Sequence, residues 1–358
     1  MFRILCTSAL LAAAISRFAA AAEPAGITLV PPVTLQKAVI YTDSDPAAID
    51  GFIENAEVTR KMVDHLVLAV TQERDVAKAW RSLVSPSDHV GIKVSSVGGR
   101  YFSSHKGVVM SVVAGLEAAG VPRSNVIVWD RSAGNLRAAG FTSEKGSYVL
   151  RSIDPPRGYD SATKITAPMF GKLIWGDLDF KGNPPGLAKT AYQEDEVSAQ
   201  SHLATVLSKE VTKVINIPVL CDEEGCGVAG ALYNMTVPNL DNNRRFTQNG
   251  GASSIVDVYA TPQIGPKVVL HIMDGLVAQY AGGPAFNPNY AFSHRTLYAS
   301  KDPVALDATA LRLMERWRKE ARLPAIGEHA SWVQEAEVMG LGRYTEDGIE
   351  IKPLSASP

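Results

Sequence analysis

Short apolar runs alternate with stretches of helical periodicity along most of the chain. From residue 37 onward, the runs 38–41, 90–94 and 126–129 read as strands, and polar turns or helix-like stretches separate them. This alternation is typical of βαβ units, in which a helix carries the chain back to the start of the next parallel strand. The sequence therefore predicts an α/β fold with a mostly parallel sheet flanked by helices.

Several of the expected helices have clear ends. The stretch 107–119 is followed by Gly120, a common residue just past a helix C-terminus. Asp302 and Pro303 predict the N-cap and first position of a long helix that runs to about residue 318. The other expected elements are helices at 56–72, 77–83, 198–208, 253–259 and 332–339 and strands at 213–217 and 268–272.

The first 22 residues do not fit the α/β pattern. They hold an apolar stretch of 12 residues, Ile4 to Ile15, followed after three residues by the alanine run 19–22. Such a stretch is too short to span about 30 Å of hydrocarbon, and the alanines supply an Ala-x-Ala cleavage site. We therefore expect a signal peptide at 1–22, with a buried N-terminal helix as the alternative.

The rest of the chain, 23–358, is expected to form a single large α/β domain. Within it, residues 143–197 are rich in glycine and proline and show only short β-like runs. They read as an irregular inserted segment, either a small subdomain or a lid. No stretch after residue 22 is apolar enough to cross a membrane.

Charge and cysteine content limit the classes of partner and cofactor. The chain has 35 Lys and Arg against 37 Asp and Glu, a net charge of −2, which excludes a basic nucleic-acid binder. Loss of residues 1–22 would remove Arg3, Arg17 and Cys6 and leave a net charge of −4. The expected mature protein is thus periplasmic or secreted, without an integral membrane segment.

Carboxylates follow most of the expected strands. In open parallel sheets, ligands bind beyond the carboxyl ends of the strands, so these side chains are expected to line one crevice. Converging acids repel one another unless a cation or substrate amines neutralise them, or some hold a proton. A divalent metal ion is the simplest of these solutions. The polar residues at these ends are Asp43, Asp45, Ser95, Ser96, Asp130, Arg131, Ser132, Asp222, Glu223, Glu224 and Asp274.

Three residues are the candidate catalytic groups of this crevice. Asp130 and Asp274 are expected to bind the metal ion or to act as acid and base. Lys93 lies inside an expected strand and would orient an anionic substrate. The alternative is that most of the acids only cap helices or solvate loops. His105 and Lys106, at the start of an expected helix, are a weaker candidate for anion binding.

The two cysteines that remain lie in the segment Cys221-Asp222-Glu223-Glu224-Gly225-Cys226. One interpretation is a small disulfide loop in an oxidising compartment, with Gly225 at the bend. The other makes Cys221, Cys226 and Glu223 metal ligands together with Asp130 and Asp274, because thiolates suit zinc and other soft metals. Both interpretations stay open at this stage.

Two cofactors are not expected. Residues 225–230 match G-x-G-x-x-G, but three acids precede the first glycine and would repel a pyrophosphate, so we expect no NAD. A [4Fe-4S] cluster needs four thiolates and only two cysteines follow residue 22, so we expect no intrinsic iron–sulfur cluster.

Several blocks resemble the family of domains of unknown function numbered 362. They include Gly91-Ile92-Lys93-Val94, the run 214–220, Ile272-Met273-Asp274-Gly275 and the run 299–307, and the similarity spans about residues 38–315. The resemblance implies an α/β fold, often in iron–sulfur or redox contexts, and no settled reaction. This chain has Cys221-Asp222-Glu223 where many members have Lys-x-His, and it lacks the ferredoxin-like cysteine module.

The sequence thus leads to alternative functions. The first is an extracytoplasmic enzyme with an acidic crevice that binds a divalent metal and acts on a small-molecule or anionic substrate. The second is a non-catalytic periplasmic protein that binds a solute or a metal, and the third is a redox accessory protein.

Overall fold

A ten-stranded sheet runs through the part of the chain that the computed structural model describes, which is residues 36–143, 147–153, 158–165, 201–241, 243–247 and 251–354. These residues fall in one compact unit, Gln36–Pro358. The expected signal peptide and most of the expected insertion lie outside the described residues.

The sheet is mostly parallel, as predicted. Its main order is β14-β1-β13-β12-β9-β4-β5-β6, and β10 pairs with β12 and β11. β13 is antiparallel to both neighbours, so β1 and β12 point the same way as β9, β4, β5 and β6. The strands are β1 (Ala38–Ser44), β4 (Val90–Val94), β5 (Val126–Asp130), β6 (Val149–Ser152), β9 (Lys213–Ile217), β10 (Val219–Glu223), β11 (Gly227–Val228), β12 (Val268–Gln279), β13 (Ala291–Ser300) and β14 (Ile349–Pro353).

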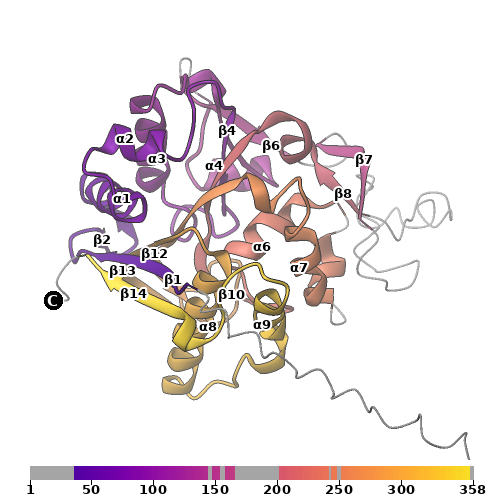
Figure 1. Ribbon diagram of the computed structural model, residues 1–358. Helices are drawn as coiled ribbons and strands as arrows, with labels where there is room; N and C mark the ends of the chain where they lie inside the picture. The colour runs from indigo at the N-terminus through magenta and orange to yellow at the C-terminus, as the bar shows by residue number, and fades with distance from the viewer. Residues whose placement is uncertain are drawn as a thin grey trace, which may run out of the picture. The chain divides into compact units, whose positions relative to one another are not determined.

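Helices cover both faces of this sheet. Figure 1 shows α1, α2 and α3 together on one side and α6, α7, α8 and α9 on the other. The helices are α1 (Ala56–Thr71), α2 (Val76–Arg81), α3 (Lys106–Ala118), α4 (Ala133–Ala138), α6 (Ala231–Thr236), α7 (Ser254–Tyr259), α8 (Pro303–Glu320) and α9 (Ser331–Val338). The α/β class predicted from the alternation is therefore confirmed.

Two hydrophobic cores result, one on each face. Along β5, Ile127 and Trp129 belong to the core beneath α6–α9, whereas Val126 and Val128 belong to the core beneath α1–α3. Successive side chains of a strand point to opposite faces, so a strand covered on both faces reads as a continuous apolar run. All five residues of β4 and of β5 are buried, which explains why both strands were recognisable in the sequence.

The structure differs from the sequence prediction at several elements. Within the expected helix 198–208, the chain forms β8 (Ser201–Ala204) and then a π-helical turn, Val206–Glu210. β8 pairs with β7 (Tyr159–Ile165), outside the main sheet. β12 extends seven residues beyond the expected strand 268–272, because its second half pairs with β13 and β10. The short β2 (Ile49–Asp50) and β3 (Ile53–Glu54) form a separate pair before α1.

None of the helices in the described ranges has the length and apolar character that a membrane span requires.

Candidate functional site

The carboxyl ends of β4, β5, β9 and β12 lie at one edge of the sheet. Lys93 is paired in register with Trp129 of β5 on one side and Asn216 of β9 on the other. Asp130 is the last residue of β5, and Asp274 lies where β12 leaves β9 and pairs with Val219 of β10. All three candidate catalytic residues therefore lie near this edge of the sheet.

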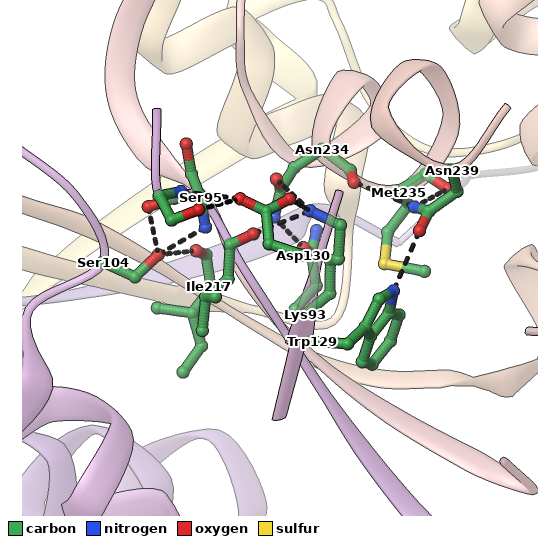
Figure 2. A network of polar contacts seen from close by, with 12 residues as sticks. Lys93, Ser95, Ser104, Trp129, Asp130, Ile217, Asn234, Met235 and Asn239 are labelled. Carbon is green, nitrogen blue, oxygen red and sulfur yellow. Dashed lines mark hydrogen bonds and ion pairs between the residues drawn. The ribbon is translucent and has the colours of Figure 1, made fainter. Parts of the chain in front are cut away.

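Lys93 and Asp130 form a buried ion pair (Figure 2). The Lys93 ammonium donates to Asp130 Oδ1 at 2.7 Å, to the Val94 carbonyl at 2.7 Å and to Asn234 Oδ1 at 3.1 Å. An ammonium has three hydrogens to donate, and all three are used. Burial lowers the pKa of Lys93, and the Asp130 carboxylate opposes that shift. In this arrangement, Lys93 has no donor left for an anionic substrate.

The second oxygen of Asp130 holds the segment that follows β4. Asp130 Oδ2 accepts hydrogen bonds from the backbone amide of Ser96, at 2.8 Å, and from its hydroxyl. The Ser95 amide donates to Ser104 Oγ, the Ser104 amide donates to the Ser95 carbonyl, and Ser104 Oγ donates to Ile217 at the end of β9. Figure 2 shows these contacts joining the ends of three neighbouring strands.

Asp274 pairs with His105, the residue before α3. The His105 amide donates to Asp274 Oδ2 at 2.7 Å, and His105 Nδ1 lies 2.9 Å from the same oxygen. The two side chains are only 5% and 0% exposed. Burial lowers the pKa of His105, but the Asp274 carboxylate and, more weakly, Glu54 outweigh it and raise the pKa above its ordinary value. His105 Nε2 is buried and has no hydrogen-bond partner among the described residues.

The first turn of α3 binds carboxylates of the protein itself. Besides the contact of His105 with Asp274, the amides of Gly107 and Val108 donate to the Glu54 carboxylate at 2.7 and 3.1 Å. The sequence predicted that an anion would be favoured at this helix start, and these two side chains occupy it. Burial raises the pKa of Glu54, and His105 opposes that shift.

A chain of buried amides and rings extends from Lys93 across the sheet. Asn234 donates to Asn216 Oδ1 at 2.8 Å, and Asn216 donates to His271 Nδ1 at 3.0 Å. His271 Nε2 lies 3.3 Å from the Tyr259 hydroxyl. Burial lowers the pKa of His271 to about 3, so this ring is neutral. His271 is therefore a hydrogen-bonded residue of the core.

The three acids that follow β9 in the sequence lie away from the network around Lys93 and His105. Asp222, Glu223 and Glu224 line a cavity of about 460 Å³ that Arg318 and His329 also line. Glu223 accepts from the amides of Gly225 and Cys226, and Asp222 Oδ1 accepts from the Gly283 amide at 3.0 Å. Burial raises the pKa of Asp222. The single acidic crevice expected from the sequence is therefore divided between a buried network and a cavity.

Cys221 and Cys226 are both free and buried, so the disulfide considered from their spacing is not formed. The Cys221 thiol donates to the Asp222 carbonyl, and the Cys226 thiol lies 3.8 Å from the Val228 carbonyl. Burial, with nearby carboxylates, raises both thiol pKa values well above the ordinary one. Metal binding requires the thiolate form, which this environment disfavours.

The predicted metal ligands, all within the described residues, are not brought together in one group. In the described part of the chain, no group of three or more His, Cys, Asp or Glu side chains is arranged to hold a metal. Lys93 pairs with Asp130 and His105 with Asp274, while Glu223 binds amides of its own turn. Each of the two aspartates thus has a basic partner within the chain, which lessens the repulsion from which a metal was predicted. Asp43 likewise pairs with His65, and Asp45 accepts from the Ala47 amide.

His105 is the residue of this candidate site that the sequence analysis underestimated. It was noted only as part of a helix start, because its partner Asp274 is 169 residues away in the chain. The signal available in the sequence was a histidine directly before a helix that follows a strand. Ser96 was noted among the strand-end residues, whereas Ser104 and Asn234 gave no separable signal.

This geometry defines an α/β protein with a buried acid–base pair at the carboxyl edge of its sheet. Residues 187–312 match the sequence model of the family described as Domain of unknown function (DUF362). The match includes β9, β12 and the first half of α8, so the resemblance drawn from the sequence is confirmed over these residues.

Two further comparisons add little. No curated protein was found to match the sequence. Among solved structures, the chain is similar to a crystal structure of a protein from Thermotoga maritima, with 11% sequence identity and a TM-score of 0.38. The alignment covers 77% of this chain and 61% of that one, so this chain spans less than two thirds of that protein's length.

Proposed function

We propose that the protein is an enzyme in which His105, held by Asp274, acts as a general acid–base. The observation that carries this proposal is the geometry of the pair. Nδ1 of His105 is bound to the Asp274 carboxylate, whereas Nε2 has no partner among the described residues. A carboxylate on one ring nitrogen fixes the tautomer and orientation of the ring and stabilises its protonated form. The other nitrogen makes no bond that competes with a ligand, so a ligand that enters beside it would exchange a proton there.

The energetics favour a ligand at Nε2. A buried polar atom without a hydrogen bond costs about 1–3 kcal/mol, and a ligand that supplies the partner recovers that cost. The pKa of His105 is raised from a value that already lies close to neutral pH, which suits proton transfer in both directions.

The charges around His105 indicate the class of substrate. Two carboxylates, Asp274 and Glu54, act on the ring, and Lys93 directs its hydrogens to acceptors within the chain. An anionic group at Nε2 would meet repulsion from both carboxylates. We therefore propose an uncharged or cationic polar substrate in place of the anionic one that the sequence suggested, and no metal-dependent step.

The test is a comparison of turnover between variants. Wild-type protein is incubated with a defined mixture of neutral and cationic esters, amides and amino compounds, and conversion is followed by mass spectrometry. We expect His105→Gln and Asp274→Asn to lower turnover about 10²–10⁴-fold, the usual contribution of a general acid–base. His89→Gln, at an exposed histidine, is the matched control. Undiminished turnover in His105→Gln, or no conversion by the wild type, would contradict the proposal.

A second candidate function is capture of a cationic solute in the cavity at Asp222, Glu223 and Glu224. The cavity favours it, because about 460 Å³ suits a small ligand and the lining has three acids against Arg318. Arg318 donates to the carbonyls of Tyr280 and Pro324, so it is occupied in holding the wall. Spermidine should then raise the melting temperature of the wild type, less so for Glu224→Gln, and be recovered unchanged.

The location outside the cytoplasm remains a prediction from residues 1–22. It is tested by the mass of the mature N-terminus after expression in a bacterium and separation of the periplasmic fraction. A mature chain that starts near Glu23 supports it, and an intact Met1 in the cytoplasmic fraction contradicts it.

A further inference from the structure

We infer that the buried Lys93–Asp130 pair, acting through Ser96 and Ser104, positions His105 against Asp274. This inference rests on the proposed role of His105. It makes Lys93 and Asp130 positioning residues, although the sequence suggested that they touch the substrate.

The segment 96–104 leads from the end of β4 to His105, and hydrogen bonds hold it at both ends. At its start, the amide and hydroxyl of Ser96 donate to Asp130 Oδ2. At its end, Ser104 exchanges hydrogen bonds with Ser95 and donates to the Ile217 carbonyl at 2.6 Å. His105 follows directly, and its backbone amide binds Asp274 Oδ2 at 2.7 Å. Figure 2 shows Ser95, Ser104 and Asp130 in one continuous network.

The residues between these anchors are only partly fixed by their own packing. Gly98 and Gly99 lie in its first half, and Gly99 has a φ of +65°, a conformation that glycine adopts without strain. Val97 and Tyr101 are each 44% exposed, whereas Phe102 is 2% exposed and forms a β-bridge with Gly98. The hydrogen bonds of Ser96 and Ser104 therefore add to the packing of Phe102 and restrain the backbone conformations that the glycines would otherwise allow.

Lys93 fixes the orientation of the Asp130 carboxylate. Its ammonium binds Oδ1, and its remaining hydrogens go to Val94 and to Asn234, which is in turn bound to Asn216. Only Oδ2 is then left for Ser96. The Lys93–Asp130 ion pair therefore determines how Oδ2 of Asp130 is directed toward the amide and hydroxyl of Ser96.

The test follows the ring of His105 and not the rate of a reaction. In full-length protein labelled with ¹³C-histidine, the His105 signal is assigned by its loss in His105→Gln, and its pKa is read from an NMR titration. The charged groups that face the ring are Asp274 and Glu54. If Ser96→Ala and Ser104→Ala loosen the contact with Asp274, the pKa of His105 should fall by about half a unit or more.

Ser111→Ala is the matched control, since Ser111 is also buried and its hydroxyl donates to Gly107 at 2.7 Å within α3, outside the network. It should leave the His105 titration unchanged. Folded Ser96→Ala and Ser104→Ala proteins with the wild-type titration would overturn the inference, as would an equal shift in Ser111→Ala. Turnover that survives His105→Gln would overturn the proposed function alone, because the titration reports positioning without any substrate.

Discussion

The ion pair of Lys93 and Asp130 has side chains that are 0% and 4% exposed, with 2.7 Å between Nζ and Oδ1. Removing a charge from water costs several kcal/mol, and the attraction between the two groups offsets this only while both are present. Each side chain of the pair is therefore required for stability mainly because the other would be left as an unpaired buried charge. This dependence is separate from any role in catalysis.

We expect Lys93→Met or Asp130→Leu alone to lower the free energy of unfolding by about 3–5 kcal/mol, because each leaves an unpaired buried charge. The double variant should lose clearly less than the sum of the two. Urea denaturation of all four proteins measures this difference. Lys61→Met, which removes a pair whose side chains are 65% and 81% exposed, should change little. Additive losses would show that the pair is not coupled.

Burial also makes His271 sensitive to acid. Its pKa is about 3 in the folded protein, below the ordinary value of a histidine in the unfolded chain. Below about pH 6.5 the unfolded state takes up a proton that the folded state does not, so stability falls as the pH drops towards 3.

We expect this residue to contribute a loss of about 1.4 kcal/mol per pH unit between pH 6 and pH 4. His271→Gln should remove that part of the slope when the free energy of unfolding is measured by urea denaturation at several pH values. Other groups, including His294 with a pKa of about 4, cancel in the difference between variant and wild type. Parallel pH profiles would contradict the prediction.

At the level of elements, the start of α8 depends on contacts close in sequence. Asp302 Oδ1 accepts from the Ala305 amide at 2.8 Å, and Pro303 occupies the first turn, as predicted. Tertiary structure adds one contact, because Asp302 Oδ2 also accepts from the Arg343 amide at 3.0 Å. The same carboxylate therefore caps the helix and fastens the segment before β14.

We expect Asp302→Ala to lower the free energy of unfolding by about 1–2 kcal/mol, the usual cost of losing an N-cap. Asp302→Asn keeps an acceptor for the Ala305 amide and should lose less. Both values come from urea denaturation, with Lys301→Ala as an exposed neighbouring control. Equal losses in the alanine and asparagine variants would show that charge, and not capping, is what matters there.

Elements that depend on distant partners were the ones that the sequence misjudged. β8 lies within a stretch with helical periodicity, but pairing of Ala204 with Tyr159 makes it a strand. β10 includes the acidic residues Asp222 and Glu223, which were expected to follow a strand, yet it pairs with β12 through Val219 and Cys221. Hydrogen bonds between strands far apart in sequence override local preference in both cases.

For the whole molecule, the pairing of charges predicts the response to metal ions. Asp130 is paired with Lys93 and Asp274 with His105, so we expect Mg²⁺, Ca²⁺ or Zn²⁺ to leave the melting temperature unchanged, and EDTA to have no effect either. An ion at 100 times its dissociation constant would stabilise the fold by about 2.7 kcal/mol, which differential scanning fluorimetry detects.

The variants then identify where any ion binds. A shift that disappears in Asp274→Asn would restore the metal centre predicted from the sequence. A shift that disappears in Glu224→Gln but persists in Asp274→Asn would place the ion in the cavity lined by Glu224.

The sequence by itself determined the α/β class, the central strands β4, β5 and β9 and the start of α8, because apolar periodicity and helix caps depend on neighbouring residues. It also brought Asp130 and Asp274 to the correct edge of the sheet. Only the tertiary structure decided how their charges are balanced. The partners of Asp130 and Asp274 are Lys93 and His105, 37 and 169 residues away, and packing alone sets which groups meet. Packing thus gave each carboxylate a basic partner within the chain, where the sequence alone had suggested a metal ion.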